Sequence, residues 1–396
     1  MRYAKVVHDL GGTGADKWAV HYRAKARRLA GEDILQLTLG ESDVPPPAEL
    51  IDRACESMRS GRTLYSNGRG EPAVLGALAR KYSRRTGRTI GTGQVLYFPG
   101  TQTALYATMR AVAEDGDEVL VGDPMYATYE GVIAASGARC VPVPLRAEDG
   151  FHLRADLLAQ AVTPRSRVLL LNSPHNPTGA VLSREEIRAI GEVCRRHDLW
   201  ILSDEVYEDL CFTGGFASPF DDAELAERTI VVASISKSHA VPGFRSGWCV
   251  ASEEFCSRLL PLSESILFGA QPFIEDMAAL ALSREFPETA RMRESYARRA
   301  ALLCDALEGA PGLRCLRPEG GMFAMVDLRE LGVDGEAFAL RLLDEYRVAL
   351  MPGEAFGAQA AGFVRVSLTV PEELLGRAAE ALRQLAARVL AERGGA

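Results

Sequence analysis

The sequence predicts an α/β protein with a mainly parallel, seven-stranded sheet and a second, smaller α+β region. From about residue 93 to residue 250, seven short apolar runs alternate with helical patterns: "QVLYFP", "EVLVGD", "ARCVPVP", "RVLLLNSP", "LWILSDE", "TIVVASIS" and "GWCVAS". Near-continuous apolar strands separated by helices are typical of a parallel sheet covered on both faces. In the last hundred or so residues, helical stretches instead surround two strand candidates, "GMFAMVDL" and "GFVRVSLT", which is typical of an α+β arrangement.

Length and composition agree with this class. The chain has 396 residues, which suits two domains or one large α/β unit. Its 47% hydrophobic and 25% charged residues are ordinary for a soluble protein. Because the net charge is −8, we expect neither a nucleic-acid partner nor an anionic membrane surface.

The cysteines and the first residues favour a cytoplasmic protein. The eight cysteines are scattered, and Cys249 and Cys256 lack the short spacing of a zinc or redox motif, so we expect reduced thiols and no metal site. No apolar run resembles a signal peptide, and no stretch reaches about 18 apolar residues. The "GGTG" at residues 11–14 follows no strand, so we interpret it as a flexible arm and not as a nucleotide loop.

Local signals place individual elements. The segment "SREEIRAIGEVCRRH" predicts a helix that Ser183 caps, with Glu186 at the capping-box position. The proline run "VPPPAE" that begins at Val44 is interpreted as the hinge by which an N-terminal arm enters the large domain.

Polar clusters follow five of the predicted strands, and these clusters are where function is expected. They are "GTQTAL", "DPMYATY", "NSPHNPTG", "SDEVY" and "SISKS". Ligands of open parallel sheets bind outside the carboxyl ends of the strands.

Two of these clusters predict an anion site. Gly100, Thr101 and Gln102 lie between a strand and a helix, where free backbone N–H groups and the helix N-terminus seat a phosphate. An ordinary strand–helix turn is the alternative. Arg245, whose guanidinium matches phosphate oxygens, and Ser234 are candidates for further anion ligands.

The remaining clusters offer groups for a ring-shaped cofactor. Lys237 ends a buried-looking strand, where a lysine is costly unless it is paired, neutral or covalently used. Asp204 follows an apolar run and could cap a helix or keep a heterocyclic nitrogen protonated. Tyr207 and Asn176 could bond the same ring, and Tyr126 could stack on it, although a plain loop and core packing are the alternatives.

Taken together, the motifs resemble the class I/II aminotransferases of the fold-type I pyridoxal phosphate (PLP) family over nearly the whole chain. The ordered set is "LTLGESD", "YSNGRGEP", "PGTQTALY", "DPMYATYE", "NSPHNPTGAVLS", "SDEVYEDL", "SISKSHAVPGFRSGW" and "FVRVSL". The resemblance implies a large seven-stranded domain and a smaller domain built from both termini. We expect an N-terminal arm and part of the small domain in 1–46, the PLP-binding domain in 47–288 and the rest of the small domain in 289–396.

The resemblance also implies roles for individual residues. Lys237 matches the lysine that forms the Schiff base with PLP. The other implied roles are phosphate contacts at Gly100, Thr101, Gln102, Ser234 and Arg245, ring stacking at Tyr126, the ring oxygen at Asn176 and Tyr207, the pyridine nitrogen at Asp204, and the substrate α-carboxylate at Arg365 with Gly40. Tyr65 matches a tyrosine that reaches the phosphate of the neighbouring subunit, which implies a homodimer. His239, close to the lysine, is interpreted as packing.

Transamination by a ping-pong mechanism is the reaction that the resemblance implies. A PLP-dependent lyase or synthase of the same fold shares the cofactor residues and is one alternative. A non-catalytic regulator of this fold is another, but such proteins usually carry a DNA-binding module, and no basic helix–turn–helix segment precedes residue 40.

Among the subfamilies, the chain is most similar to the arginine:pyruvate transaminases, through "WAVHYRAKARRLAGEDILQL", the lysine block and "RPEGGMFAMVDL". A guanidinium donor needs carboxylates at the far end of its pocket. The acidic candidates are Asp16, Glu41, Asp43 and Glu275, each with a solvated surface charge as its alternative. An aspartate, aromatic or broad-range donor is the other reading, and an apolar pocket around Tyr22, Phe268 and Met322 would suit an aromatic or broad-range one.

Overall fold

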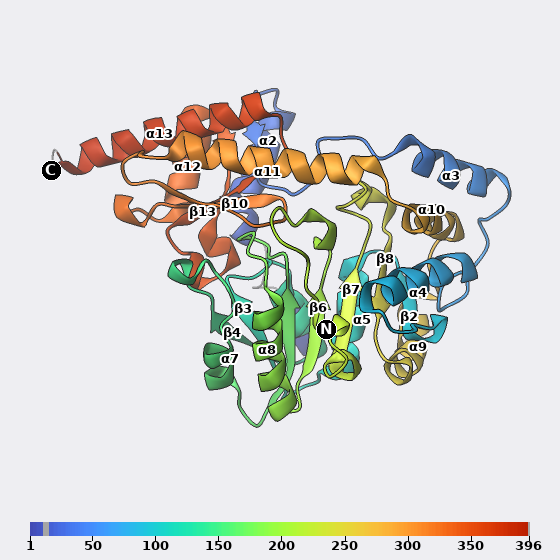
Figure 1. Ribbon diagram of the computed structural model, residues 1–396. Helices are drawn as coiled ribbons and strands as arrows, with labels where there is room; N and C mark the ends of the chain where they lie inside the picture. The colour runs from blue at the N-terminus through green and yellow to red at the C-terminus, as the bar shows by residue number, and fades with distance from the viewer. Residues whose placement is uncertain (11–15, 395–396) are drawn as a thin grey trace.

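A seven-stranded sheet forms the centre of the computed structural model, which describes residues 1–10 and 16–394 (Figure 1). In spatial order its strands are β2 (Val95–Phe98), β8 (Gly247–Val250), β7 (Thr229–Ala233), β6 (Trp200–Asp204), β5 (Ser166–Asn172), β3 (Glu118–Asp123) and β4 (Arg139–Pro144). Only the two pairings of β8, with β2 and β7, are antiparallel. The predicted mainly parallel sheet is therefore confirmed. The "GGTG" segment, which we interpreted as a flexible arm, lies outside the described residues.

Helices cover both faces because the side chains of the strands alternate between two cores. In β5, Leu170 packs toward one face, whereas Leu169 and Leu171 pack toward the other. The first face is covered by α5 (Thr101–Val112), α6 (Tyr129–Ser136) and α9 (Glu253–Leu267). The second is covered by α7 (Ala155–Ala161), α8 (Arg184–Arg196), α4 (Pro72–Thr86) and α10 (Pro272–Ser283), and α3 (Ala48–Arg59) packs on α10.

The predicted capping box of α8 is present. The backbone N–H of Glu186 donates to the Ser183 hydroxyl at 3.2 Å, and the backbone N–H of Ser183 donates to the Glu186 carboxylate at 2.7 Å. The two bonds satisfy donors that a helix start otherwise leaves open.

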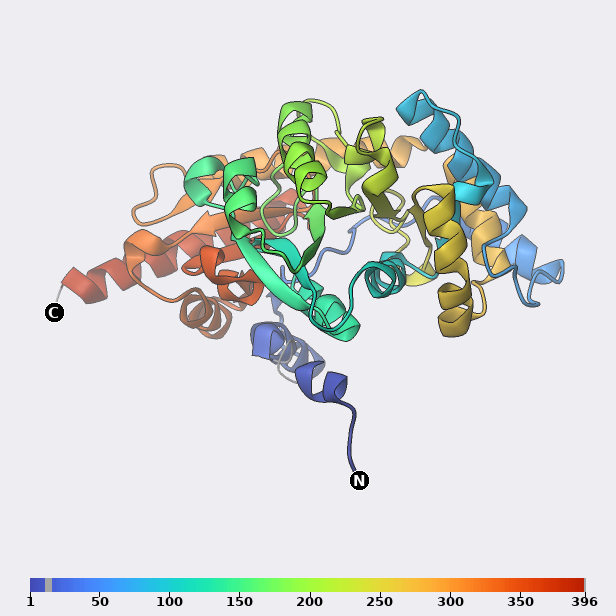
Figure 2. The same cartoon turned by 90° about the horizontal axis from the view of Figure 1, so that it is seen from below.

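The smaller region contains segments from both ends of the chain. Its antiparallel sheet has the order β12 (Met351–Pro352), β13 (Phe363–Ser367), β10 (Phe323–Asp327) and β9 (Arg314–Leu316), and its helices are α11 (Pro287–Leu307), α12 (Gly335–Tyr346) and α13 (Glu372–Gly394). From the N-terminal side, β1 (Leu35–Gln36) pairs with β11 (Val348–Ala349), and α2 (Ala19–Leu29) packs on α12. Figure 2 shows the first residues, with α1 (Lys5–Leu10), projecting from the body of the molecule. The predicted boundaries 46/47 and 288/289 stay a prediction.

Candidate active site

The carboxyl ends of the parallel strands β5, β6 and β7 share one edge of the large sheet, and a cavity opens there. Asn172 and Asp204 pair directly in the register of β5 and β6. The N-terminal segment around Gly40 and strand β13 complete the lining. The structure brings these predicted residues together in the cavity: Gly40, Thr101, Gln102, Tyr126, Asn176, Asp204, Tyr207, Ser234, Lys237, Arg245 and Arg365.

Lys237 lies in the turn that follows β7. Its Nζ donates a hydrogen bond to the backbone oxygen of Gly40 at 2.7 Å. Burial lowers the pKa of the Lys237 ammonium to about 8, and the nearby Arg365 and Arg245 act in the same direction. More of this amine is neutral near pH 8 than for an exposed lysine, so it is suited to act as a nucleophile or a base.

Asp204 is buried at the end of β6 and caps no α-helix. The Tyr129 hydroxyl donates to its Oδ2 at 2.7 Å, and the backbone N–H of Val206 donates to its Oδ1 at 3.2 Å. Burial raises the pKa of the carboxyl to about 6, against the opposing effect of these two donors. A cationic N–H brought to this oxygen would favour the ionised carboxylate.

An anion cradle lies at the start of α5. Gly100 has φ +91°, and a Cβ at this position would lie 2.1 Å from Nη2 of Arg245. A Cβ on Gly247 would lie 2.7 Å from the backbone nitrogen of Thr101. The buried Thr101 hydroxyl has no hydrogen-bond partner among residues 1–10 and 16–394. The site therefore combines the Thr101 hydroxyl, the N-terminus of α5 and the Arg245 guanidinium, and the two glycines leave the space between them open. These groups are the ones that bind phosphate.

Arg365 is a buried cation in the middle of β13. It donates to the Asn176 side-chain oxygen at 2.9 Å and to the backbone oxygen of Thr38 at 2.6 Å. Its guanidinium carbon lies 3.8 Å from the ring centroid of Phe323 and 4.5 Å from that of Phe356. Within the described chain its Nε has no partner, so the guanidinium keeps a donor for a carboxylate ligand.

Some residues of the site were not predicted from the sequence. Tyr129 holds Asp204, and Asn172 donates to the Asp204 backbone oxygen at 3.0 Å while it accepts from the Asn176 backbone at 2.9 Å. Tyr129 lies in "DPMYATY" and Asn172 in "NSPHNPTG", two of the polar clusters at strand ends, so their position in these clusters could have indicated a role in the site. Phe323 also belongs to a quoted segment, "GMFAMVDL", but that segment predicted only a strand. The contact of Phe323 with Arg365 joins two strands of the smaller sheet that lie far apart in the sequence, so it had no local signal.

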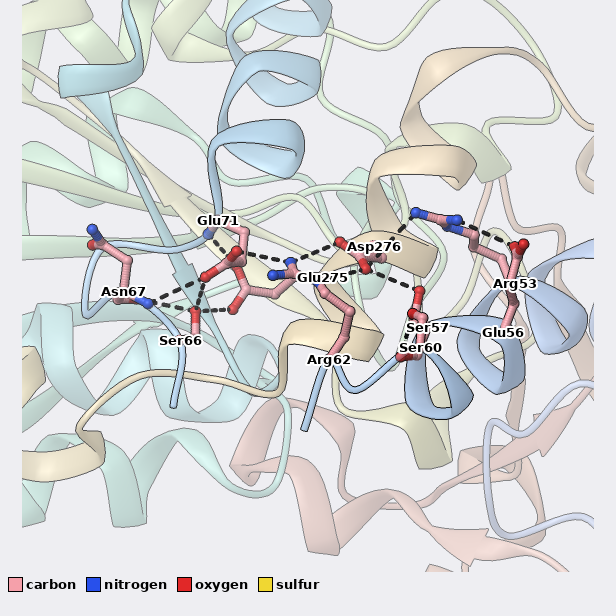
Figure 3. A network of polar contacts seen from close by, with 10 residues as sticks. All are labelled: Arg53, Glu56, Ser57, Ser60, Arg62, Ser66, Asn67, Glu71, Glu275 and Asp276. Atoms are coloured by element: carbon pink, nitrogen blue, oxygen red, sulfur yellow. Dashed lines mark hydrogen bonds and ion pairs between the residues drawn. The ribbon is translucent and has the colours of Figure 1, made fainter. Parts of the chain in front are cut away.

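Two of the four acidic candidates for a donor pocket are wrong, because they are already bonded elsewhere. Asp43 forms an ion pair with Arg299 at 2.7 Å. Glu275 is fully buried and accepts from the Ser66 hydroxyl at 2.6 Å and from the backbone N–H of Glu71 (Figure 3). The side chain of Asp16 lies outside the described part of the structure. Of the three candidates whose side chains the structure describes, Glu41 alone lines the cavity.

The predicted apolar pocket around Tyr22, Phe268 and Met322 is also wrong for this chain. Tyr22 and Phe268 are exposed, and Met322 is fully buried in the core of the smaller region. By contrast, the packing interpretation of His239 is confirmed, since it is buried against Phe286 and lines no part of the cavity.

Tyr65 does not line the cavity of its own chain. Its side chain is 85% exposed and contacts the exposed Phe268 ring edge to face, with 5.0 Å between ring centroids. Its predicted role in a neighbouring subunit stays a prediction.

Comparisons with known proteins agree with this geometry. The family model "Aminotransferase class I and II" matches residues 32–382. The chain is 45% identical to the arginine–pyruvate transaminase of Pseudomonas aeruginosa, over 99% of this chain and all of that protein, and 30% identical to an aspartate aminotransferase of Geobacillus stearothermophilus, over 97% and 98%. A double mutant of Thermus thermophilus aspartate aminotransferase superposes with a TM-score of 0.91 at 31% identity, covering 97% of this chain and all of the other. The chain therefore belongs to the class I and II aminotransferases, whose members depend on pyridoxal phosphate.

Proposed function

We propose that this aminotransferase moves the α-amino group of L-arginine to a 2-oxo acid, pyruvate or 2-oxoglutarate, in a ping-pong reaction. The observation that carries the choice of donor is the 45% identity, over nearly the full length of both chains, to an arginine–pyruvate transaminase. The cavity chemistry supports it. Its basic lining residues are Lys237, Arg245 and Arg365, each with an implied role, so the described chain provides no spare cation for an acidic donor side chain.

The residues present fit pyridoxal phosphate. Its phosphate would bind in the open space at Gly100, where the Thr101 hydroxyl and the Arg245 guanidinium are available as ligands. Gln102 and Ser234 line the same cavity. The Asp204 carboxylate would accept a hydrogen bond from the protonated ring nitrogen. Tyr126 would stack on the ring, and Asn176 and Tyr207 would bond its oxygen. When bound, the cofactor supplies an aldehyde that takes up the amino group and a cationic ring that withdraws electrons from Cα.

Side chains of the protein bind the substrate and move the proton. Arg365 binds the α-carboxylate of the donor and fixes which bond at Cα faces Lys237. Lys237 in its neutral form would take the proton from Cα as general base. It would then deliver the proton, as general acid, to the former aldehyde carbon of the cofactor on the other side of the amino nitrogen. Asp204 stays ionised and thereby holds the proton on the ring nitrogen.

The donor is tested by kcat/KM for L-arginine, L-lysine, L-aspartate, L-tyrosine and L-alanine, each with pyruvate and with 2-oxoglutarate. We expect L-arginine to lead the series by at least about tenfold, which corresponds to about 1.4 kcal/mol of differential transition-state binding. A series led by L-aspartate or L-tyrosine would overturn the proposed donor and leave the aminotransferase class intact.

We further propose a homodimer in which Tyr65 reaches the phosphate of the neighbouring active site. Leu64, Tyr65 and Phe268 expose 80%, 85% and 65% of their surface, and adjacent exposed apolar side chains mark interaction surfaces. The segment that carries Leu64 and Tyr65 is anchored on both sides (Figure 3): Arg62 donates to Asp276 at 2.9 Å, and Ser66 donates to Glu275.

Analytical ultracentrifugation is expected to give the mass of two chains. In addition, Tyr65→Phe should weaken binding of the cofactor about tenfold, because one hydrogen bond to a charged phosphate is lost. The matched control is Tyr22→Phe, an exposed tyrosine of α2, which should bind the cofactor normally. A fully active single-chain species would contradict the proposal.

A cytoplasmic location is also proposed. All eight cysteines are free thiols in the structure, as expected where glutathione keeps thiols reduced. Within residues 1–10 and 16–394, no helix is long and apolar enough to cross a membrane.

A further inference from the structure

Among the side chains that the structure describes, two acidic ones line the active-site cavity, and only one of these has a place in the transamination chemistry described above. Asp204 is buried and held by Tyr129 and Val206. Glu41 is exposed and follows Gly40, whose backbone oxygen accepts the bond from Lys237. Among the described residues, Glu41 takes part in no hydrogen bond or ion pair that would hold its carboxylate.

The charge of Glu41 acts on the cavity. Its carboxylate opposes the lowering of the Lys237 pKa that burial causes, and it acts in the same sense on the pKa of His21, which burial lowers. Glu41 lines the same cavity as Lys237, and its sequence neighbour Gly40 bonds the Lys237 amine at 2.7 Å, so its carboxylate is placed to attract a cation that enters the cavity. Its sequence neighbour Asp43 cannot take this part, because Arg299 already neutralises it.

We infer that Glu41 binds the side-chain cation of the amino donor and selects a guanidinium over neutral side chains. This inference rests on the proposed arginine donor. A donor held by its α-carboxylate at Arg365 would extend a long methylene stem, for which Trp18 and Leu39 in the same lining offer apolar surface. Its guanidinium would then bond the Glu41 carboxylate, a geometry that favours bidentate pairing.

The exposure of Glu41 sets the size of the effect. An ion pair at the mouth of a cavity is screened by water and salt, so it contributes less than a buried pair. We therefore expect a selectivity of about tenfold for the charged side chain, and we expect this selectivity to fall as ionic strength rises.

The test compares L-arginine with L-citrulline, which has nearly the same length and shape but carries a neutral ureido group. In the wild type, kcat/KM for L-arginine should exceed that for L-citrulline. In Glu41→Gln the ratio should fall about tenfold, mainly through KM for L-arginine. The loss for L-arginine should exceed any change in kcat/KM for L-citrulline and L-alanine, because loss of the Glu41 charge also acts on Lys237 and thereby on every donor alike. The matched control is Glu336→Gln, an exposed glutamate at the start of α12, which should keep the wild-type ratio.

Salt gives a second readout. The arginine-to-citrulline ratio of the wild type should decline between low and high NaCl, and that of Glu41→Gln should be flat. If the wild type prefers L-arginine and Glu41→Gln keeps the full ratio, the role of Glu41 is overturned and the proposed donor stands. If the wild type does not prefer L-arginine, the proposed donor fails, and the role of Glu41 fails with it.

Discussion

Replacing Lys237 by alanine is expected to lower kcat by at least about 10⁴-fold, the upper end of what general acid–base catalysis contributes. The amine lies in the cavity at 2.7 Å from the Gly40 backbone oxygen, and burial has lowered its pKa to about 8. No other lysine lines this cavity in the described chain, so no second amine can move the proton at Cα. The variant should also lose the visible absorbance of the lysine-bound cofactor.

The matched control is Lys25→Ala, which removes an exposed lysine of α2 and should leave activity and absorbance unchanged. Reduction of the wild-type holoenzyme with borohydride, followed by peptide mapping, should place the cofactor on Lys237. A Lys237→Ala variant that kept both the absorbance and the turnover would show that another group performs this chemistry.

Asp204→Asn is expected to lower kcat by about a hundred- to a thousandfold, the range for removing one group that stabilises developing charge. The amide has the size of the carboxyl group but no charge, so it cannot hold a proton on the ring nitrogen. Because Thr101, Ser234 and Arg245 are untouched, the variant should still bind the cofactor.

A graded variant distinguishes this role from a structural one. Tyr129→Phe removes the 2.7 Å hydrogen bond to Asp204 but leaves the carboxylate in place, so kcat should fall only about tenfold. Near-normal kcat in Asp204→Asn, with cofactor bound, would contradict the assigned role.

The strands and their polar ends were predictable from the sequence because their signals are local. Each strand of the large sheet is a short apolar run, and Asn172 and Asp204 come at the end of such runs. Parallel connectivity then brings those ends to one edge. The same local logic found the Ser183 cap of α8.

The donor pocket was less predictable because its residues are decided by partners far away in the sequence. Asp43 and Glu41 look alike in "GESD", yet Arg299, 256 positions beyond Asp43, pairs with only one of them. Glu275 looked like an available carboxylate until the fold placed Ser66 and Glu71 against it.

The most direct test is the half-reaction of the wild-type holoenzyme with L-arginine in the absence of any acceptor. We expect one equivalent of pyridoxamine phosphate and one of the corresponding 2-oxo acid per subunit, with no ammonia released. The same screen across the common amino acids should show L-arginine reacting fastest. Release of ammonia, or failure of L-arginine to form the amine cofactor while other amino acids do, would contradict the proposed reaction.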